Sequence, residues 1–270
     1  MEPHPPIFIL SCERSGSTLL QFILDTHPDI CSPGEMAMGA LCRDLRVAVS
    51  RSFGTRFLDD LRKREETEKR EVRQTLSGLF SKFAHNQGKK IWCDKIPYNL
   101  KYLEHLEWTF PDARYVCLHR AALDVVHSCL ELPEKEYLWW ALPHVVKHQR
   151  NLAAAFLDSW VEKTGVLLDF EAGHPQSFRI KYEDLVADPP KALIPLFRFL
   201  GVDWDPSLPE RIFTLRRDPD AGGDYKMHST RRIEKDQVGK GARLDPALLS
   251  RVPADLRERQ AQLQRRLGYE

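Results

Sequence analysis

The sequence predicts an α/β fold with three layers, α/β/α, in which flanking helices cover a central parallel sheet. Two observations carry this prediction. Short, nearly continuous apolar segments alternate with segments of helical periodicity, which is typical of parallel strands buried on both faces. The first apolar segment also leads through a turn of small polar residues straight into a helical pattern, which is half of a βαβ unit.

Four strands are expected from apolar runs at residues 5–12, 90–95, 113–120 and 177–185. A helical pattern follows each of them, at residues 18–26, 99–110, 122–132 and 189–201. The first helix is expected to stop at His27-Pro28, because proline does not continue a helix. The last begins with two prolines and ends in Gly201, the usual asymmetry between the start and the end of a helix.

Longer helical segments are expected between residues 41 and 87 and between residues 137 and 164, where they flank or cap the sheet. The first contains a dense run of charges, interpreted as a solvated helix face with ion pairs four residues apart. Residues 245–270 are expected to form C-terminal helices. Residues 216–243 lack periodicity and contain Gly222-Gly223 and Gly239-Lys240-Gly241, which predicts a long mobile loop that covers a ligand.

The composition places few limits on function. The chain has 270 residues, 40 Lys or Arg, 39 Asp or Glu and a formal net charge of +1. A chain of this length can bury a large core, so one domain over residues 1–270 is expected. A balanced charge excludes a whole-molecule attraction to nucleic acid or to an anionic membrane. A bound anion would need a local cluster of cations, and residues 211–243 hold nine Lys or Arg against five Asp or Glu.

The six cysteines are interpreted as reduced core residues, because none forms a C-x-x-C pair and three lie inside apolar runs. Neither a disulfide framework nor a metal site is expected. The first residues lack the basic segment of a signal peptide, and no apolar stretch reaches about 18 residues, the length of a membrane span. A cytoplasmic location is therefore expected.

The turn from Glu13 to Thr18 is the strongest functional signal. Such a turn directs backbone N–H groups and the positive end of a helix dipole at one point, and Gly16 allows close approach of a ligand. Arg14 adds a full charge and the hydroxyls of Ser15 and Ser17 add donors. A phosphate cradle is expected, although a serine-rich helix cap alone would explain the same residues. The G-x-x-x-x-G-K-[ST] pattern of a P-loop ATPase is absent.

Two later strands also end in cations. Arg120 closes the strand at 113–120, and Ser128 follows two helical turns on, so the two could hold one anionic group. Lys95 closes the strand at 90–95. The carboxyl ends of parallel strands share one edge of a sheet, so these cations are expected beside the phosphate cradle. A surface arginine and a helical serine bonded to its own backbone are the alternative interpretation.

Together these residues resemble the sulfotransferases that use 3′-phosphoadenosine 5′-phosphosulfate (PAPS). The motifs that carry the resemblance run from Ile7 to about Gly241 and are R-S-G-S-T-L at 14–19, L-D-x-H-P-D-I at 24–30, D-K-x-P at 94–97, F-P-D-A-R at 110–114, the Arg120/Ser128 spacing and Y-E-D-L at 182–185. They are most similar to the branch with the protein-tyrosine sulfotransferases and many bacterial relatives. The resemblance implies a P-loop-like α/β/α fold with a C-terminal loop over the cofactor.

The resemblance also implies roles for individual residues. It implies a PAPS site formed by Arg14, Ser15, Gly16, Ser17, Thr18, Leu19, Arg120, Ser128, Tyr182, Ser229, Lys240 and Gly241. The 14–19 segment would hold the 5′-phosphosulfate, and Arg120 with Ser128 the 3′-phosphate. Arg14 and Lys95 would stabilise charge on the leaving group, with no metal. Glu35, in a Gly-Glu segment after the turn, would be the base that takes the acceptor's proton. A histidine base, from His27, His119 or His127, is the alternative.

The function that this implies is transfer of a sulfuryl group from PAPS to a hydroxyl or amine of a small molecule, leaving adenosine 3′,5′-bisphosphate. Aromatic residues that could line a pocket for a phenolic or apolar acceptor are Phe53, Trp92, Tyr98, Trp139 and Trp140, although aromatic residues at helical spacing are more often core. An ATP-dependent kinase of the P-loop class and a non-catalytic nucleotide-binding protein are the alternatives. The sequence leaves the oligomeric state open, and neither nucleic acid nor a membrane span is expected as a partner.

Overall fold

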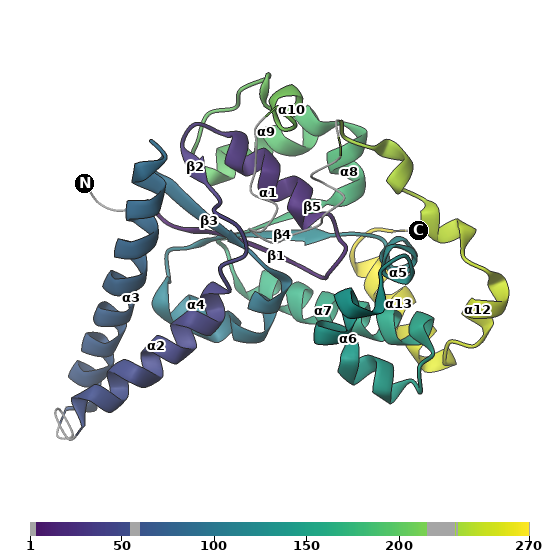
Figure 1. Ribbon diagram of the computed structural model, residues 1–270, viewed down its shortest axis with the longest axis horizontal. Helices are drawn as coiled ribbons and strands as arrows, with labels where there is room; N and C mark the ends of the chain where they lie inside the picture. The colour runs from purple at the N-terminus through teal and green to yellow at the C-terminus, as the bar shows by residue number, and fades with distance from the viewer. Residues whose placement is uncertain (1–3, 55–59, 215–229, 231, 270) are drawn as a thin grey trace.

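The computed structural model describes residues 4–54, 60–214, 230 and 232–269. Five strands form one sheet in the order β2-β3-β1-β4-β5, and every neighbouring pair is parallel. The strands are β1 (Ile7–Ser11), β2 (Ile30–Cys31), β3 (Ile91–Lys95), β4 (Arg114–His119) and β5 (Ser177–Lys181). Helices lie on both faces of this sheet, so the predicted three-layer α/β/α class is confirmed (Figure 1).

Helices fill the connections between the strands and continue after the last strand, β5. They are α1 (Ser17–Thr26), α2 (Met38–Phe53), α3 (Leu61–Asn86), η1 (Pro97–Tyr102), α4 (Leu103–Thr109), α5 (Ala122–Leu130), α6 (Glu134–Lys147), α7 (Leu152–Gly173), α8 (Tyr182–Ala187), α9 (Pro189–Leu200), α10 (Leu208–Arg211), η3 (Lys235–Gln237), η4 (Lys240–Arg243), α12 (Pro246–Ser250) and α13 (Ala254–Arg266). The first and last predicted helix stops are confirmed, because α1 ends before His27 and α9 ends at a left-handed Gly201.

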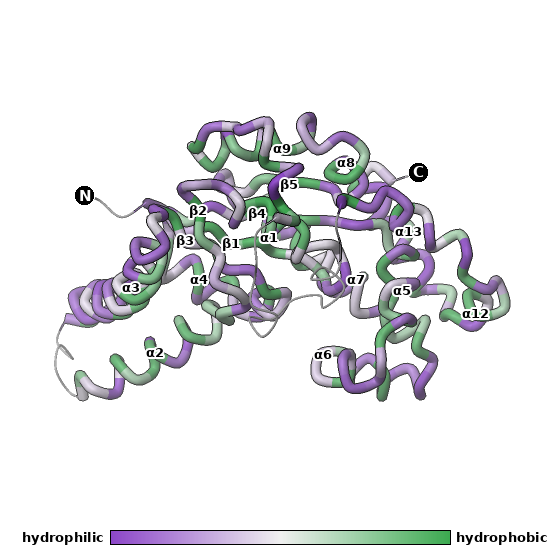
Figure 2. Tube along the Cα trace, turned by 45° about the horizontal axis from the view of Figure 1, so that its top comes forward, coloured by the Kyte–Doolittle hydropathy of each residue, from purple (hydrophilic) through white to green (hydrophobic). Residues whose placement is uncertain are grey.

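Alternating residues of the central strand divide the core. Ile7 and Ile9 of β1 pack with α1, α8 and α9, whereas Phe8 and Leu10 pack with α2, α3, α4 and α7. All four side chains are fully buried, which explains why the sequence of β1 is apolar throughout. Figure 2 shows hydrophobic residues along the strands and hydrophilic residues on α3. A third cluster joins α5, α6, α7 and α13 beside the sheet.

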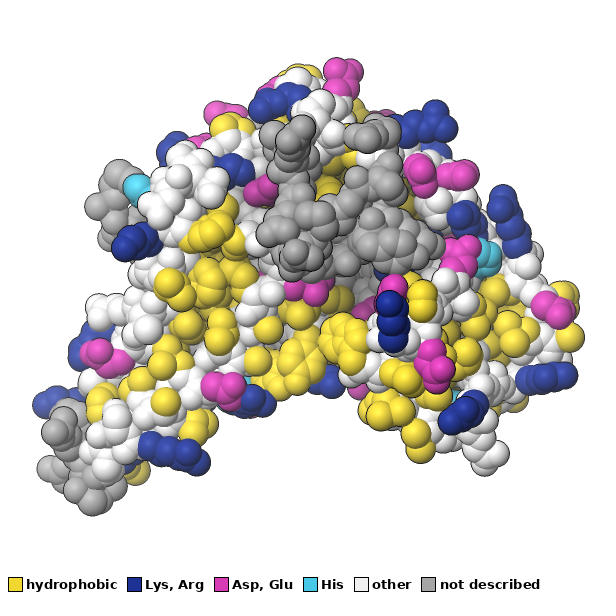
Figure 3. Space-filling view, viewed as in Figure 1, with side chains coloured by type: hydrophobic (Ala, Val, Ile, Leu, Met, Phe, Trp, Pro, Cys, Tyr) yellow, Lys and Arg dark blue, Asp and Glu magenta, His cyan; other side chains and the backbone are white. Residues whose placement is uncertain are grey.

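The α2–α3 arm projects from the sheet on the side of β3 (Figure 1). Its run of charges is largely exposed and contains ion pairs four residues apart, Arg62 with Glu66 at 3.8 Å and Arg64 with Glu68 at 2.9 Å. The expected ion pairs are therefore present, but only the first lies on a solvated face, because the side chains of Arg64 and Glu68 are 19% and 9% exposed. Across the sheet, α6 projects in the same direction, and the molecule is hollowed between the two (Figure 3).

Three details of the sequence prediction were wrong. The strand expected over 177–185 ends at Lys181, and Tyr182 begins α8, because Glu183 and Asp184 favour a helix N-terminus. The helix expected over 137–164 is two helices, separated where Gln149 and Arg150 adopt left-handed backbone conformations. Strand β2 was missed because two residues are too short to show a pattern.

All six cysteines are buried and free, which confirms their interpretation as reduced core residues. Burial raises the pKa of the Cys42 thiol to about 12 and that of Cys31 to about 11, so both are neutral at physiological pH. In the described part of the chain, no helix combines the length and the hydropathy that a bilayer span requires.

Candidate active site

A cavity of about 370 Å³ opens at the carboxyl edge of the sheet, above β1, β3 and β4. Strands β1 and β4 are neighbours, but the chain continues from β1 toward β2 at one edge and from β4 toward β5 at the other. Such a change of direction leaves a crevice, which is where open α/β sheets bind ligands. The residues predicted from sequence that line the cavity are Arg14, Gly16, Ser17, Thr18, Leu19, Glu35, Lys95, Arg120, Ser128, Tyr182 and Lys240.

The turn after β1 has the backbone of an anion site. Arg14 and Gly16 both adopt left-handed conformations, with φ of 62° and 88°, and α1 begins at the next residue. Turns of this kind direct successive backbone N–H groups toward one point at a helix N-terminus. Ser15 lies behind the turn, where its Oγ is buried and has no hydrogen-bond partner among the described residues. An anionic ligand with several acceptor oxygens fits this donor set.

The requirement for glycine at position 16 has a steric cause. A Cβ on Gly16 would overlap the ring of Tyr182, which closes the turn from the start of α8. The guanidinium of Arg120 also lies over the Tyr182 ring, with its Cζ 4.4 Å from the ring centroid. Tyr182 therefore packs against the turn through Gly16 and against β4 through Arg120.

Arg120 joins the turn to the C-terminal segment. Its Nη1 donates to the carbonyl of Arg14 at 2.9 Å, and its Nη2 donates to the carbonyl of Gln237 at 2.6 Å. Its Nε is buried and has no partner among the described residues. A buried donor without a partner costs free energy, so this Nε fits a site that an anionic ligand completes. Ser128 lies on the same side, where its Oγ accepts a hydrogen bond from Arg14 Nε at 3.1 Å.

The described part of the C-terminal segment closes one wall of the cavity. Thr230, Arg232, Gln237 and Lys240 line it, as expected for a loop that covers a ligand. Gly241 lies behind this wall, and its N–H donates to Asp124 of α5 at 2.6 Å. The Asp124 carboxylate also accepts from the N–H of Gly239 at 2.8 Å. Ser229 lies outside the described residues.

Glu35 and Lys95 form an ion pair at the other end of the cavity. The Lys95 side chain is 2% exposed, and its ammonium also lies 3.5 Å from Thr18 Oγ1. The ion pair uses Oε1 of Glu35, whose side chain is 22% exposed. No described residue hydrogen-bonds to Oε2, so this oxygen is free to accept a proton from a bound molecule.

The three histidines considered as alternatives lie elsewhere. Both ring nitrogens of His27 are bonded to backbone, to the carbonyl of Asp203 and the N–H of Asp29. His119 is buried against Glu171 of α7 at 2.5 Å. His127 lies 3.8 Å from Glu131. Among the described residues that line the cavity there is no histidine.

A model of the sulfotransferase family matches residues 5–206, about three quarters of the chain. The chain belongs to the sulfotransferase family. The predicted family and the predicted PAPS-dependent enzyme are therefore confirmed, and the match favours a sulfotransferase over a kinase.

The relatives of this sulfotransferase agree with the branch that its motifs indicated. Protein-tyrosine sulfotransferase 2 of Gallus gallus is 24% identical over 276 residues, which cover 98% of this chain and 70% of that protein. Protein-tyrosine sulfotransferase 1 of Homo sapiens is 32% identical over 127 residues, 47% of this chain and 34% of that protein.

The fold of this sulfotransferase matches solved structures over nearly its whole length. The sulfotransferase domain of the Synechococcus PCC 7002 olefin synthase superposes with a TM-score of 0.69 at 25% identity, covering 99% of this chain and 96% of that chain. The sulfotransferase domain from the curacin biosynthetic pathway gives 0.68 at 21% identity, covering 100% and 99%. The P-loop-like topology expected from the motifs is confirmed.

Only part of the aromatic prediction agrees with the structure of this sulfotransferase. Trp139 and Trp140 of α6 line the cavity. Trp92 instead packs in the core, edge-on to Phe8 with ring centroids 5.7 Å apart. Tyr98 and Phe53 do not line the cavity; the Tyr98 hydroxyl is hydrogen-bonded to that of Tyr102.

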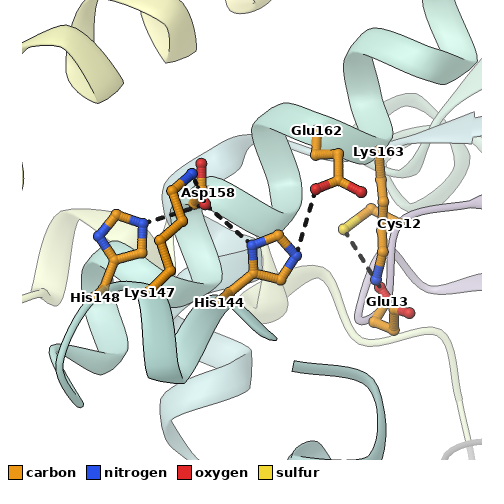
Figure 4. Close-up of polar contacts among 8 residues, drawn as sticks. All are labelled: Cys12, Glu13, His144, Lys147, His148, Asp158, Glu162 and Lys163. Carbon is orange, nitrogen blue, oxygen red and sulfur yellow. Dashed lines mark hydrogen bonds and ion pairs between the residues drawn. The ribbon is translucent and has the colours of Figure 1, made fainter. Parts of the chain in front are cut away.

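Sequence reasoning missed the charges that fix the turn and α6. Glu13 forms a buried ion pair with Lys163 of α7, which tethers the turn from behind. On the same helix Asp158 accepts from Lys147 at 2.7 Å and contacts His144 of α6 at 3.1 Å and His148, directly after α6, at 3.2 Å (Figure 4). These contacts hold α6, with its two tryptophans, against α7. The sequence did carry one signal for this contact: an acidic residue in one helical pattern, Asp158, and basic residues in the helical pattern before it.

Proposed function

We propose that this sulfotransferase uses Glu35 as the base that activates the hydroxyl of an apolar small molecule for sulfuryl transfer. One observation carries the proposal: a single cavity has an anion cradle with partnerless donors at one end and a carboxylate–ammonium pair at the other. When bound, PAPS would supply the sulfuryl group and leave as adenosine 3′,5′-bisphosphate.

The residues of the cradle divide between the two ends of the nucleotide. The backbone N–H groups of the turn, that of Ser15 among them, would hold the 5′ group together with Arg14 and the hydroxyls of Ser17 and Thr18. Arg120 and Ser128 would hold the 3′-phosphate, and the partnerless Nε of Arg120 supports this role. Lys240 would lie over the nucleotide from the C-terminal segment, with Tyr182 and Gly241 packed behind.

The chemistry of the chain's own residues follows from their charges. Glu35 would accept the proton of the acceptor hydroxyl at its free oxygen, Oε2. Lys95 holds the other oxygen and places a buried positive charge beside Thr18, at the start of α1. With Arg14 it would offset the negative charge that grows on the leaving oxygen, and such fixed donors act most strongly in a site that excludes water.

The acceptor side of the cavity supports an apolar or phenolic alcohol. Pro97, Leu132, Trp139 and Trp140 provide its apolar surface. Trp139 is 62% exposed, which is unusual for tryptophan and leaves its indole available to a ligand. Glu131 and Glu136 also line the cavity, and their carboxylates would disfavour an acidic acceptor. The protein-tyrosine sulfotransferases among the relatives make a peptide phenol the alternative acceptor.

Titration calorimetry and a transfer assay together test this function. Adenosine 3′,5′-bisphosphate should bind more tightly than ATP with Mg²⁺ or NAD, and ³⁵S-labelled PAPS should label 2-naphthol or octan-1-ol in preference to an acidic tyrosine peptide. Preferred binding of ATP with Mg²⁺ would favour a kinase. Binding of the bisphosphate without transfer to any acceptor, including the peptide, would favour a non-catalytic protein.

A further inference from the structure

We propose that Asp94 is a positioning residue that holds the Glu35 segment and the start of α2 in place from strand β3. The proposal rests on the proposed role of Glu35. It adds a residue that touches neither nucleotide nor acceptor and acts through the backbone that follows the base.

The contacts of Asp94 lie directly after Glu35 in the chain. Its Oδ1 accepts the N–H of Met36 and its Oδ2 accepts the N–H of Met38, each at 2.9 Å. The Asp94 side chain is fully buried, where a carboxylate is costly unless it is fully hydrogen-bonded. Two bonds to the residues that follow Glu35 fix the path of the backbone that carries it.

Asp94 also replaces the missing cap of α2. The residue at the cap position is Ala37, which has no side-chain acceptor and adopts a left-handed conformation with φ of 51°. Such a helix start is unfavourable, because the cap position lacks a side-chain acceptor and its backbone is strained. Asp94 supplies the acceptors from another strand and places negative charge at the positive end of the helix.

Asn99 fixes the orientation of this carboxylate. Its Nδ2 donates to Asp94 Oδ2 at 2.8 Å, and its Oδ1 accepts the N–H of Gly39 at 3.0 Å. Burial raises the pKa of Asp94, and the donors from Asn99, Met38 and Met36 oppose that rise by binding the ionised form. Asp94 and Asn99 together thus accept backbone N–H groups from Met36 to Gly39 and fix the backbone at the start of α2.

The other side of Glu35 is held independently. Ser32 donates its N–H to Asp25 at 3.0 Å and its hydroxyl to the carbonyl of Cys93, also at 3.0 Å. The segment from Pro33 to Glu35 is therefore fixed at both ends, by the bonds of Ser32 before it and by the bonds of Asp94 after it. Because Lys95 follows Asp94 directly in β3, one strand fixes both the backbone of the proposed base and its ionic partner.

Asp94→Asn tests the proposal, because it keeps the size of the side chain and replaces one accepting oxygen with a donor. We expect turnover of PAPS with 2-naphthol to fall about a hundredfold, the cost of a displacement of about 1 Å in a reacting group. The affinity for adenosine 3′,5′-bisphosphate, measured by calorimetry, should be nearly unchanged. Amide hydrogen exchange at residues 36–39 should become faster.

Asp124→Asn is the matched control. Asp124 is also buried and also accepts two backbone N–H groups, but those of Gly239 and Gly241 in the segment that lines the cofactor end. The control should weaken bisphosphate binding and accelerate exchange at residues 239–241, while exchange at residues 36–39 stays as in the wild type.

Two kinds of result would overturn the role of Asp94. The first is that Asp94→Asn leaves either the exchange at residues 36–39 or the turnover unchanged. The other is a loss of turnover and bisphosphate affinity in equal proportion, because that pattern indicates general damage to the core. Faster exchange at 36–39 in the variant, with no transfer by the wild type to any acceptor, would support Asp94 as the anchor of this segment and reject the proposed function.

Discussion

The turn after β1 offers a ligand mainly backbone N–H groups, whereas the opposite end of the cavity offers one carboxylate and one ammonium. We call these the cofactor half (residues 14–19, Arg120, Ser128 and the 230–241 segment) and the base half (Glu35, Lys95 and the start of α6). The cofactor half depends on backbone conformation and on contacts among its own members. The base half depends on two side chains and on the buried network behind them. Single substitutions should therefore separate binding from turnover.

The largest separation is expected from Glu35→Gln. The amide cannot take a proton from the acceptor, so turnover should fall by about 10²- to 10⁴-fold, the range for loss of a general base. Calorimetry should find the bisphosphate affinity nearly unchanged. Glu136→Gln is the control, since it removes a carboxylate from the same cavity and should alter turnover little. Equal losses in both variants would assign the base elsewhere.

Arg120→Ala should produce the opposite pattern. Loss of a guanidinium beside a phosphate should weaken binding of adenosine 3′,5′-bisphosphate by about ten- to a hundredfold. Binding of adenosine 5′-phosphate, which lacks the 3′ group, should weaken much less. Arg232→Ala, at an exposed arginine of the same cavity, is the control. A similar loss for both nucleotides would contradict the assignment of Arg120 to the 3′-phosphate.

Two glycines test how strictly the cofactor half depends on its backbone. In Gly16→Ala the new Cβ meets the Tyr182 ring at a left-handed φ, so we expect a loss of about 1–3 kcal/mol in the free energy of unfolding, together with weaker nucleotide binding. In Gly165→Ala nothing lies near the new Cβ within α7, so we expect a gain of about 0.5–1 kcal/mol. Denaturant unfolding of both variants measures the difference. Equal effects would mean that the turn tolerates a side chain.

The smallest effect is expected from pH, on the packing of α6 that forms the acceptor wall. Burial alone would raise the pKa of Asp158, but hydrogen bonds from Lys147, His144 and His148 lower it to about 2. The unfolded pKa is about 4, so this stabilisation is complete above that value and is lost as the pH falls toward 2, by at most about 2 kcal/mol. In urea unfolding of wild type and Asp158→Asn between pH 6 and pH 2, the difference in the free energy of unfolding should narrow as the pH falls below about 4. Parallel curves would contradict the assignment.

Local pattern was enough to predict the cofactor half. A buried strand, a small polar turn and a helix follow one another in the chain, and parallel strands bring their carboxyl ends to one edge. Arg14 and Arg120 could therefore be placed together from the sequence, with Lys95 of the base half beside them. Their roles stay predictions that the variants above test. Tyr182 was placed near the site by a motif, but its helix was mistaken for a strand because its apolar spacing fits both.

The supports behind the site could not be predicted. Asp94 and Met36, Asp124 and Gly241, and Glu13 and Lys163 are far apart in sequence and meet only when the layers pack. Each support is a carboxylate in an apolar environment, and a single sequence does not distinguish such a residue from a surface acid. Periodicity reports which face of an element is buried, whereas these contacts depend on the exact distance between elements.

Arg120 connects β4 to carbonyls from the first turn of the chain and from its C-terminal segment. During synthesis, the sheet and the turn can form before Gln237 has left the ribosome, so the hydrogen bond from Arg120 to Gln237 is added after both. The Arg120 side of the cavity is therefore completed by a carbonyl that lies 117 residues further along the chain.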